Sequence, residues 1–230
     1  MSAPGAGLDG VAITVDDSAV IVRARGAPLR VLSSAVVGGG LVEARTLVNL
    51  HVDNDHGCAD PEGMVAAFAA RRGLPGPVVG LLTAAWTERA VIAEAHEGAF
   101  AARVVSTVGL SHPIAAGHTG ALAWHASTIN VIAVVTGDPE PAALVNAVAT
   151  IAEVKVDCLR AAGLADPEGR PATGTATDAV AVAATGLGPR ARFGGPASEL
   201  GAVIAKAARA SLEHGVREWL QRAAGRRAIP

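Results

Sequence analysis

The segment that most constrains this chain is residues 173–178, Thr-Gly-Thr-Ala-Thr-Asp, which runs directly into the uncharged apolar stretch 179–184. The apolar stretch predicts a buried strand. Alternate side chains of an extended segment share a face, so the three threonines are expected to line up beside one another. A carboxylate at the mouth of a buried strand needs a partner, because burying an unpaired charge costs free energy. Asp178 therefore favours a functional site here, although threonine is also common at ordinary strand starts.

Composition bounds the size and the class of the protein. The chain has 230 residues, of which half are hydrophobic and only 17% are charged, so a sizeable core is available. No repeat or linker composition divides the chain. We therefore expect a single domain over residues 1–230, with residues 1–10 and 225–230 flexible.

Charge and hydropathy narrow the range of partners. A net charge of −2 and an aromatic content of 3% give no basis for nucleic-acid binding. The first ten residues lack the features of a signal peptide, and no apolar run approaches the roughly 20 residues that cross a bilayer. We expect a cytoplasmic protein that binds a small molecule and no membrane, whose many alanines are compatible with a homodimer. Cys58 and Cys158 are expected to be reduced thiols.

The apolar pattern predicts an α+β fold. Nine strands are expected, at residues 11–15, 19–22, 30–37, 46–52, 77–85, 90–95, 100–110, 127–135 and 173–184. Three helices are expected, at residues 61–72, 139–164 and 198–224. Asp138 before Pro139 is expected to cap the second helix, and Ser198 the third. This order favours layered mixed β-sheets covered by two or three long helices. The chain has neither a dinucleotide-binding nor a phosphate-loop motif, which disfavours a nucleotide fold.

The second predicted helix carries charged residues whose placement decides their role. One face has apolar residues at helical spacing together with a lysine: Leu144, Val148, Ile151, Lys155 and Cys158. Glu153 and Lys155 lie about 200° apart around the helix, so they cannot pair with each other. We expect Glu153 to meet Thr175 or Asp178 where the helix packs on the strand. The alternative is that Glu153 belongs to a solvated helix face.

Common catalytic and metal-binding patterns have little support. His51, His56 and Cys58 are the nearest approach to a zinc site, but no second cluster of ligands accompanies them, and we predict no metal. Three further histidines share one loop at spacings that match no helical ligand pair: His112, His118 and His125. No Gly-x-Ser-x-Gly nucleophile motif is present. The nearest serine candidates precede the three glycines at 38–40, which indicate a turn or a close approach to another group.

Several short segments together resemble a known family. From Val31 to Leu220 the chain resembles the adenosylcobinamide amidohydrolases of corrinoid salvage. The segments that carry the resemblance are Ser33–Leu41, Gly80–Ala85, Ser106–Ser111, Thr128–Asn130, Glu153–Lys155, Thr173–Asp178 and Gly195–Gly201. The resemblance implies hydrolysis of the amide that joins aminopropanol to the corrin ring, without a cofactor. The expected products are adenosylcobyric acid and 1-aminopropan-2-ol.

The chain departs from the family pattern at three places. It has Asn49-Leu50-His51 where the family usually has Asn-His, Ser198 where threonine is usual, and His112 where asparagine is usual. These differences concern the detail of substrate binding more than the class of reaction.

Amide hydrolysis needs a nucleophile, a base and donors for the oxyanion. We expect Glu153, Asp178 and Thr175 to be catalytic. The expected substrate-binding residues are Ser33, Ser34, Gly39, Gly40, His51, Thr83, Ser111, His112, Asn130, Thr173 and Thr177. Whether Thr175 attacks or only orients a water stays open. Two other functions also stay open: a corrinoid-binding protein without catalysis, and a self-processing hydrolase with Thr173 or Thr175 as its new N-terminal nucleophile.

Overall fold

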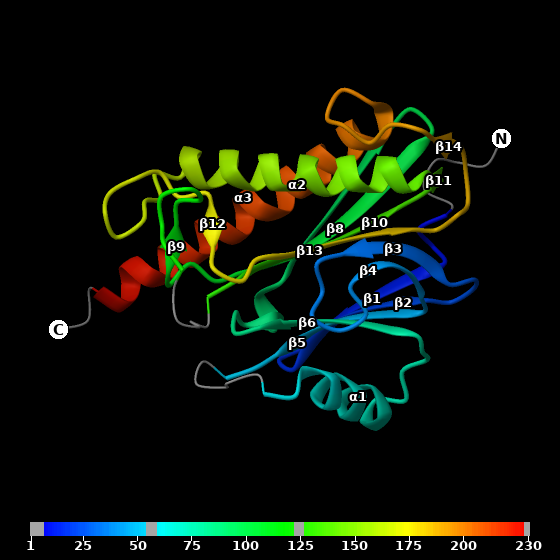
Figure 1. Ribbon diagram of the computed structural model, residues 1–230, viewed down its shortest axis with the longest axis horizontal. Helices are drawn as coiled ribbons and strands as arrows, with labels where there is room; N and C mark the ends of the chain where they lie inside the picture. Colours follow the sequence, from blue (N-terminus) through cyan, green and yellow to red (C-terminus); the bar gives the residue numbers. More distant parts are fainter. Residues whose placement is uncertain (1–6, 54–58, 122–126, 228–230) are drawn as a thin grey trace.

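The computed structural model describes residues 7–53, 59–121 and 127–227. Within them the chain forms four layers, with two helices over a six-stranded sheet, a four-stranded sheet beneath it, and one helix on the far side (Figure 1). The helices are α1 (Pro61–Arg71), α2 (Pro141–Ala161) and α3 (Glu199–Arg227). The predicted α+β class with layered mixed sheets is confirmed.

The larger sheet has the strand order β4-β3-β13-β10-β8-β7. Its strands are β3 (Leu29–Ser33), β4 (Gly40–Ala44), β7 (Val91–Glu97), β8 (Phe100–Val108), β10 (Ile129–Val135) and β13 (Ala179–Ala184). The smaller sheet has the order β1-β2-β5-β6, with β1 (Val11–Val15), β2 (Ala19–Ala24), β5 (Thr46–His51) and β6 (Val78–Thr83). Two short pairs join β9 (Pro113–Ile114) to β12 (Gly174–Thr175) and β11 (Asp138–Pro139) to β14 (Arg190–Ala191). A 3₁₀ turn, η1 (Thr87–Arg89), follows β6.

Three apolar interfaces hold the layers together. α2 and α3 pack on β8, β10 and β13, the two sheets pack face to face, and α1 packs on the smaller sheet. All seven residues of β10 are buried, because helices cover one face of its sheet and the second sheet covers the other. Among the described residues no helix is long and apolar enough to cross a membrane.

The parallel pair β10–β13 determines where the polar residues collect. Asn130 is in register with Ala179, so both strands begin at the same edge of the larger sheet. The residues that precede the two strands therefore lie beside each other. The smaller sheet contributes the end of β6 to the same place, because the side-chain amide of Asn130 donates to the Leu82 carbonyl at 2.8 Å.

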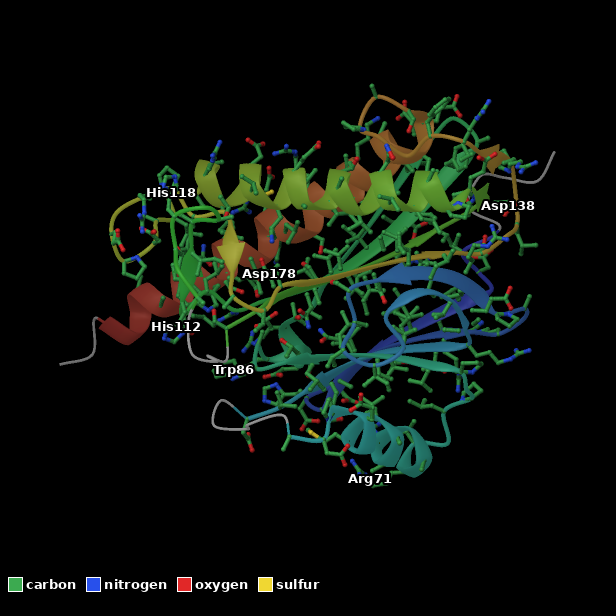
Figure 2. All side chains as sticks on the ribbon, in the orientation of Figure 1. Arg71, Trp86, His112, His118, Asp138 and Asp178 are labelled. Atoms are coloured by element: carbon green, nitrogen blue, oxygen red, sulfur yellow. The ribbon has the colours of Figure 1, made fainter. Side chains whose placement is uncertain are left out.

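The helix predictions hold, with one correction at a helix start. The hydroxyl of Ser198 accepts a hydrogen bond from the Gly201 amide at 3.0 Å and caps α3, as expected. Asp138 does not cap α2, which begins at Pro141. Asp138 lies in β11, and its carboxylate binds Arg30 at 2.7 Å. Figure 2 shows Asp138 near one end of the molecule and Asp178 nearer the other.

The strand predicted over residues 173–184 is interrupted. Only Gly174 and Thr175 are extended before a turn at residues 176–177, and β13 begins at Ala179. The Asp178 carboxylate accepts the Thr175 amide at 3.1 Å and also contacts the Thr175 hydroxyl. Side-chain bonds of this kind offer the backbone an alternative to a continuous sheet ladder.

Candidate functional site

A pocket of about 230 Å³ opens between the two sheets at the edge where β10 and β13 begin. Five segments of the chain form it: the residues after β3, the residue after β5, the end of β6, and the residues before β10 and before β13. Its lining residues are Ser34, Val36, Val52, Leu81, Leu82, Thr83, Ala84, Ser127, Thr128, Thr177, Asp178 and Ala179. Of the residues predicted from sequence, this pocket brings together Ser34, Thr83, Thr177 and Asp178.

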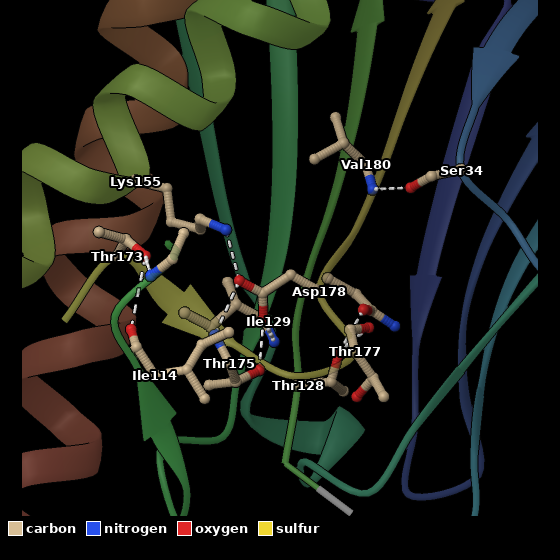
Figure 3. A network of polar contacts seen from close by, with 12 residues as sticks. Ser34, Ile114, Thr128, Ile129, Lys155, Thr173, Thr175, Thr177, Asp178 and Val180 are labelled. Carbon is tan, nitrogen blue, oxygen red and sulfur yellow. Dashed lines mark hydrogen bonds and ion pairs between the residues drawn. The ribbon is translucent and has the colours of Figure 1, made fainter. Parts of the chain in front are cut away.

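Asp178 is the centre of the polar network at this pocket (Figure 3). Its Oδ1 accepts the Ile129 amide at 2.9 Å and contacts the Thr175 hydroxyl, while its Oδ2 accepts the Thr175 amide and the Lys155 ammonium. An ionised carboxylate has about four acceptor positions, and here all four are occupied. Asp178 is therefore a fixed, charge-compensated carboxylate on the pocket wall.

Lys155 reaches Asp178 from α2 and compensates its charge. The two side chains retain only 13% and 11% of their exposure, so this ion pair is largely withdrawn from water. Gly174 makes room for it, because a Cβ at that position would collide with the Asp178 carboxylate and lie 2.8 Å from Lys155 Nζ. The glycine of the Thr-Gly-Thr-Ala-Thr-Asp segment thus has a packing function.

The Thr175 hydroxyl has two acceptors for its single proton. It lies within hydrogen-bonding distance of Asp178 Oδ1 and 2.8 Å from the Ser127 carbonyl. The Thr177 hydroxyl donates to that same carbonyl at 3.0 Å. Thr175 is buried and does not line the pocket, whereas Thr177 is exposed and does. Thr175 is therefore placed to hold Asp178 rather than to touch a substrate in the pocket.

Two other hydroxyls on the wall retain a proton to donate. Ser34 Oγ accepts the Val180 amide at 3.0 Å, and Thr83 Oγ1 accepts the Ala85 amide at 3.0 Å. No group in the described part of the chain accepts the hydroxyl proton of either residue. Ser34 and Thr83 can therefore both donate a hydrogen bond to a group that enters the pocket.

A buried polar chain supports this wall from behind. Thr128 donates to the Asn130 side chain at 2.8 Å, Asn130 donates to Asn49 at 2.8 Å, and Asn49 donates to Thr107 at 2.9 Å. The chain crosses from the larger sheet to β5 and back. Buried polar groups require such partners, and a fully satisfied network fixes the positions of its members. Asn130 therefore supports the site without lining the pocket.

Glu153 does not take part in this site. Its side chain is exposed and lies in a shallow outer groove of α2 with Ala152, Val156, Asp157 and Arg160. The residue two positions further along, Lys155, is the one that meets Asp178. The alternative interpretation of Glu153, a solvated helix face, is the one that the structure supports.

Several predicted binding residues have local structural partners instead. Ser33 is buried and accepts the Ala35 amide at 3.4 Å, and Thr173 accepts the Ala116 amide at 2.9 Å. Gly39 lies in the connection between β3 and β4, where a Cβ would collide with the Ala35 carbonyl, and Gly40 begins β4 with φ +86°. These residues do not line the pocket.

The remaining predicted residues lie near its margins. Ser111 and His112 are exposed on the loop before residue 122, and the His112 amide donates to Ser127 Oγ at 3.2 Å. His51 Nδ1 lies 3.1 Å from the Ala85 carbonyl. None of the three lines the pocket, although Ser127 and the segment before Ala85 do.

The cysteine and metal expectations are tested only in part. His56, Cys58 and His125 lie outside the described residues. Within residues 7–53, 59–121 and 127–227, no group of three histidine, cysteine or acidic side chains could hold a metal ion. Burial raises the pKa of the Cys158 thiol to about 11, so this cysteine stays protonated and unreactive.

A comparison with models of protein families shows to which family the chain belongs. The model of one family, the adenosylcobinamide amidohydrolases, matches residues 8–224, which is nearly the whole chain. This chain belongs to the adenosylcobinamide amidohydrolase family. Four of the seven segments that carry the sequence resemblance to the family supply residues of the pocket, and a fifth supplies Lys155.

Solved structures give more distant likenesses. A beta-aminopeptidase from Burkholderia sp. is 12% identical with a TM-score of 0.46, over 90% of this chain and 79% of that chain. The PH0078 protein from Pyrococcus horikoshii OT3 is 12% identical with a TM-score of 0.44, over 92% of this chain and 83% of that chain. No curated protein matches the sequence.

Lys155 is the main residue that the sequence interpretation did not assign to the site of this amidohydrolase. The signal was present, because Lys155 is one of only two lysines and lies on the apolar face of the predicted helix. A lysine on a face that packs against a strand needs a buried partner. Asp178, a carboxylate at the mouth of a buried strand, fits that requirement.

Proposed function

We propose that this protein hydrolyses the amide that joins aminopropanol to the corrin ring of adenosylcobinamide, releasing adenosylcobyric acid and 1-aminopropan-2-ol. The observation that carries the proposal is the family match over residues 8–224, and four of the seven segments that resemble the family supply residues of the pocket beside Asp178. The pocket combines an apolar lining with hydroxyl groups and a carboxylate, which suits a short aliphatic amide.

Ser34 and Thr83 stabilise the amide oxygen in this proposal. Each hydroxyl is held by a backbone amide and has a proton left to donate. Donors that are fixed before the substrate arrives stabilise the negative charge that develops on the carbonyl oxygen when a nucleophile attacks. Both residues line the pocket, which supports this role.

Asp178 acts as the base that activates a water molecule. To accept a proton it must release one of its four donors, and the Thr175 hydroxyl is the donor that can leave. This hydroxyl can turn to the Ser127 carbonyl, which lies 2.8 Å away, and so free one position on Oδ1. Lys155 and the two backbone amides continue to hold the carboxylate during this change.

The atoms and protons balance in two steps. The water oxygen bonds to the amide carbon while Asp178 takes one water proton, giving a tetrahedral intermediate whose oxyanion is held by Ser34 and Thr83. The carbon–nitrogen bond then breaks, and Asp178 passes its proton to the leaving nitrogen. The products are the corrinoid carboxylic acid and the free aminoalcohol, and Asp178 returns to its ionised form.

The test is incubation of the purified protein with adenosylcobinamide, followed by chromatography for both products. We expect adenosylcobyric acid and 1-aminopropan-2-ol in equal amounts. If the corrinoid binds but neither product appears, the protein is a binding protein and the enzymatic proposal is wrong.

Intact-mass measurement on the same sample separates attack by water from self-processing. An unprocessed chain has a mass of 22.9 kDa. Two fragments of roughly 17 and 6 kDa, cut before Thr175, would instead support an N-terminal threonine nucleophile.

A further inference from the structure

The pocket is small for the whole substrate of the proposed function. Its volume of about 230 Å³ lies below the roughly 300–1,000 Å³ of pockets that enclose a drug-sized ligand. A corrin macrocycle with its metal and side chains is larger than a drug-sized ligand. The macrocycle therefore cannot enter this pocket, whereas a single aliphatic amide arm can.

The chemistry of the lining matches such an arm. Apolar side chains provide most of the pocket surface, among them Val52, Leu81 and Leu82, and these suit methylene and methyl groups. The hydroxyls and Asp178 suit an amide and a terminal alcohol. A ligand with a short carbon chain, one amide and one hydroxyl would satisfy both parts of the lining.

Apolar side chains also remain exposed next to the pocket. Val36 lines it and is still 51% exposed, and Trp86, two residues after the lining residue Ala84, is 44% exposed. Trp86 lies at the start of η1, where its carbonyl accepts the Arg89 amide at 3.1 Å. The amide of Val37 donates to Gly80 at 3.1 Å and anchors the segment that carries Val36 to β6. Figure 2 shows Trp86 at the same end of the molecule as Asp178.

We propose that Val36 and Trp86 form an apolar rim that holds the corrin macrocycle outside the pocket, while only the aminopropanol arm enters it. This inference rests on the proposed function. A flat indole surface buries a large apolar area at low cost in side-chain entropy, which suits a flat macrocycle. Trp86 then determines affinity for the corrinoid, and the pocket determines which arm reaches Asp178.

Binding measurements test the rim independently of turnover. In an Asp178→Asn background, equilibrium dialysis of adenosylcobinamide, followed by its visible absorbance, gives the Kd without hydrolysis. We expect Trp86→Ala to raise this Kd by roughly tenfold. Ile92→Ala is the matched control, because Ile92 is 46% exposed on β7 and does not line the pocket; it should leave Kd unchanged. If Trp86→Ala leaves Kd unchanged, the proposal that Trp86 holds the macrocycle is wrong, even if the protein hydrolyses adenosylcobinamide.

A second variant tests whether the arm alone enters the pocket. Ala84→Leu adds bulk to the lining and should abolish release of aminopropanol while it leaves Kd for adenosylcobinamide within about threefold. Loss of binding together with turnover, with an unchanged melting temperature, would place the macrocycle itself in the pocket and overturn the inference. If the wild type binds the corrinoid but releases no product, only the proposed function fails, since the Kd comparison between Trp86→Ala and Ile92→Ala still decides the rim.

Discussion

Asp178 and Asp16 lie in different regions of the molecule but accept hydrogen bonds from the same kinds of donor. Each carboxylate accepts two backbone amides, one hydroxyl and one cationic side chain. For Asp178 these come from Ile129, Thr175 and Lys155. For Asp16, in the turn between β1 and β2, they come from Ser18, Ala19 and Arg72.

The difference lies in their surroundings. The Lys155–Asp178 pair retains 13% and 11% of its side-chain exposure, whereas the Arg72–Asp16 pair retains 42% and 29%. Asp178 lines the pocket between the two sheets, whereas Asp16 does not line that pocket. The Thr175 hydroxyl has a second acceptor, the Ser127 carbonyl. Among the described residues, Asp16 is the one acceptor of the Ser18 hydroxyl, which itself accepts a hydrogen bond from Arg72.

This comparison teaches that the donor set alone does not identify a catalytic carboxylate. Both arrangements fix a turn by satisfying a charged side chain locally. Only Asp178 combines that fixation with access to a pocket and with a donor that can turn away. Equivalent substitutions around Asp178 and around Asp16 should therefore distinguish effects on catalysis from effects on stability alone.

Removing the two carboxylate charges should give the largest contrast. Asp178→Asn is expected to lower kcat for adenosylcobinamide by at least about a hundredfold, because removal of a general base typically costs a factor of about 10² to 10⁴. Asp16→Asn should keep kcat within about twofold. Product chromatography under saturating substrate measures both. Normal turnover in Asp178→Asn would remove this residue from the mechanism.

A further control follows from the position of Glu153. Because its side chain is exposed on the outer groove of α2, Glu153→Gln should keep wild-type turnover in the same assay. A loss comparable with that of Asp178→Asn would mean that α2 presents a different face in the working enzyme.

Removing the cations should affect stability unequally. Lys155→Met leaves Asp178 largely buried without its counter-charge, and breaking such a pair costs about 3–5 kcal/mol. Arg72→Met breaks a more exposed pair, for which a cost below about 1 kcal/mol is expected. Urea unfolding followed by circular dichroism gives both free energies of unfolding. Equal losses in the two variants would contradict the contrast in burial.

The sequence predicted the layers of this fold better than the partners within the site. Apolar periodicity was sufficient to predict the three helices and the strands with clear patterns. The reason is that the apolar face of a helix or strand is set by the order of residues within that one segment. The edge strand β4 was not predicted because it begins at the last of three consecutive glycines and is mostly exposed. The turn at residues 176–177 was missed because it depends on bonds to Asp178 that no periodicity records.

The helix α2 shows why the site itself was only partly predictable. The 200° separation of Glu153 and Lys155 meant that only one of them could face the strand, and the apolar face of the helix already contained Lys155. The prediction that Glu153 meets Thr175 or Asp178 does not agree with the phase of the helix, which directs Lys155 toward the strand. The need for a glycine at position 174 could not be predicted from the sequence either, because it arises from an ion pair between residues of separate elements.

Removing the Thr175 and Ser18 hydroxyls should give a smaller difference in turnover between the two regions. The Thr175 variant also identifies the nucleophile. Thr175→Val keeps the shape of the side chain and removes the donor that regulates access to Asp178. If water attacks, the position on Asp178 Oδ1 that this hydroxyl has to vacate is already free, so kcat should stay within about tenfold of wild type with KM unchanged. Complete loss of turnover, restored by Thr175→Ser, would show that the Thr175 hydroxyl attacks directly. Ser18→Ala should leave both kcat and KM unchanged.

The smallest effect is expected from the acid titration of Asp16. Burial alone would raise the pKa of this carboxyl, but hydrogen bonds from Ser18 and Ala19 and the charge of Arg72 outweigh burial and lower it. A carboxyl whose pKa is lower in the folded state stabilises the fold above its unfolded-state pKa of about 3.9, and this contribution is lost as the pH falls through the folded-state value. Asp16→Asn should therefore reduce the free energy of unfolding by less than about 1 kcal/mol at pH 7.

The pH dependence of that difference is the decisive part of the measurement. Because protonation removes the same charge that the substitution removes, the urea midpoints of the wild type and Asp16→Asn should converge as the pH falls below about 4 and through the lowered pKa of Asp16. A difference that stays constant down to pH 2 would mean that the substitution acts through the geometry of the turn and not through the charge. In that case Asp16 and Asp178 would differ in the nature of their stabilisation as well as in their access to a pocket.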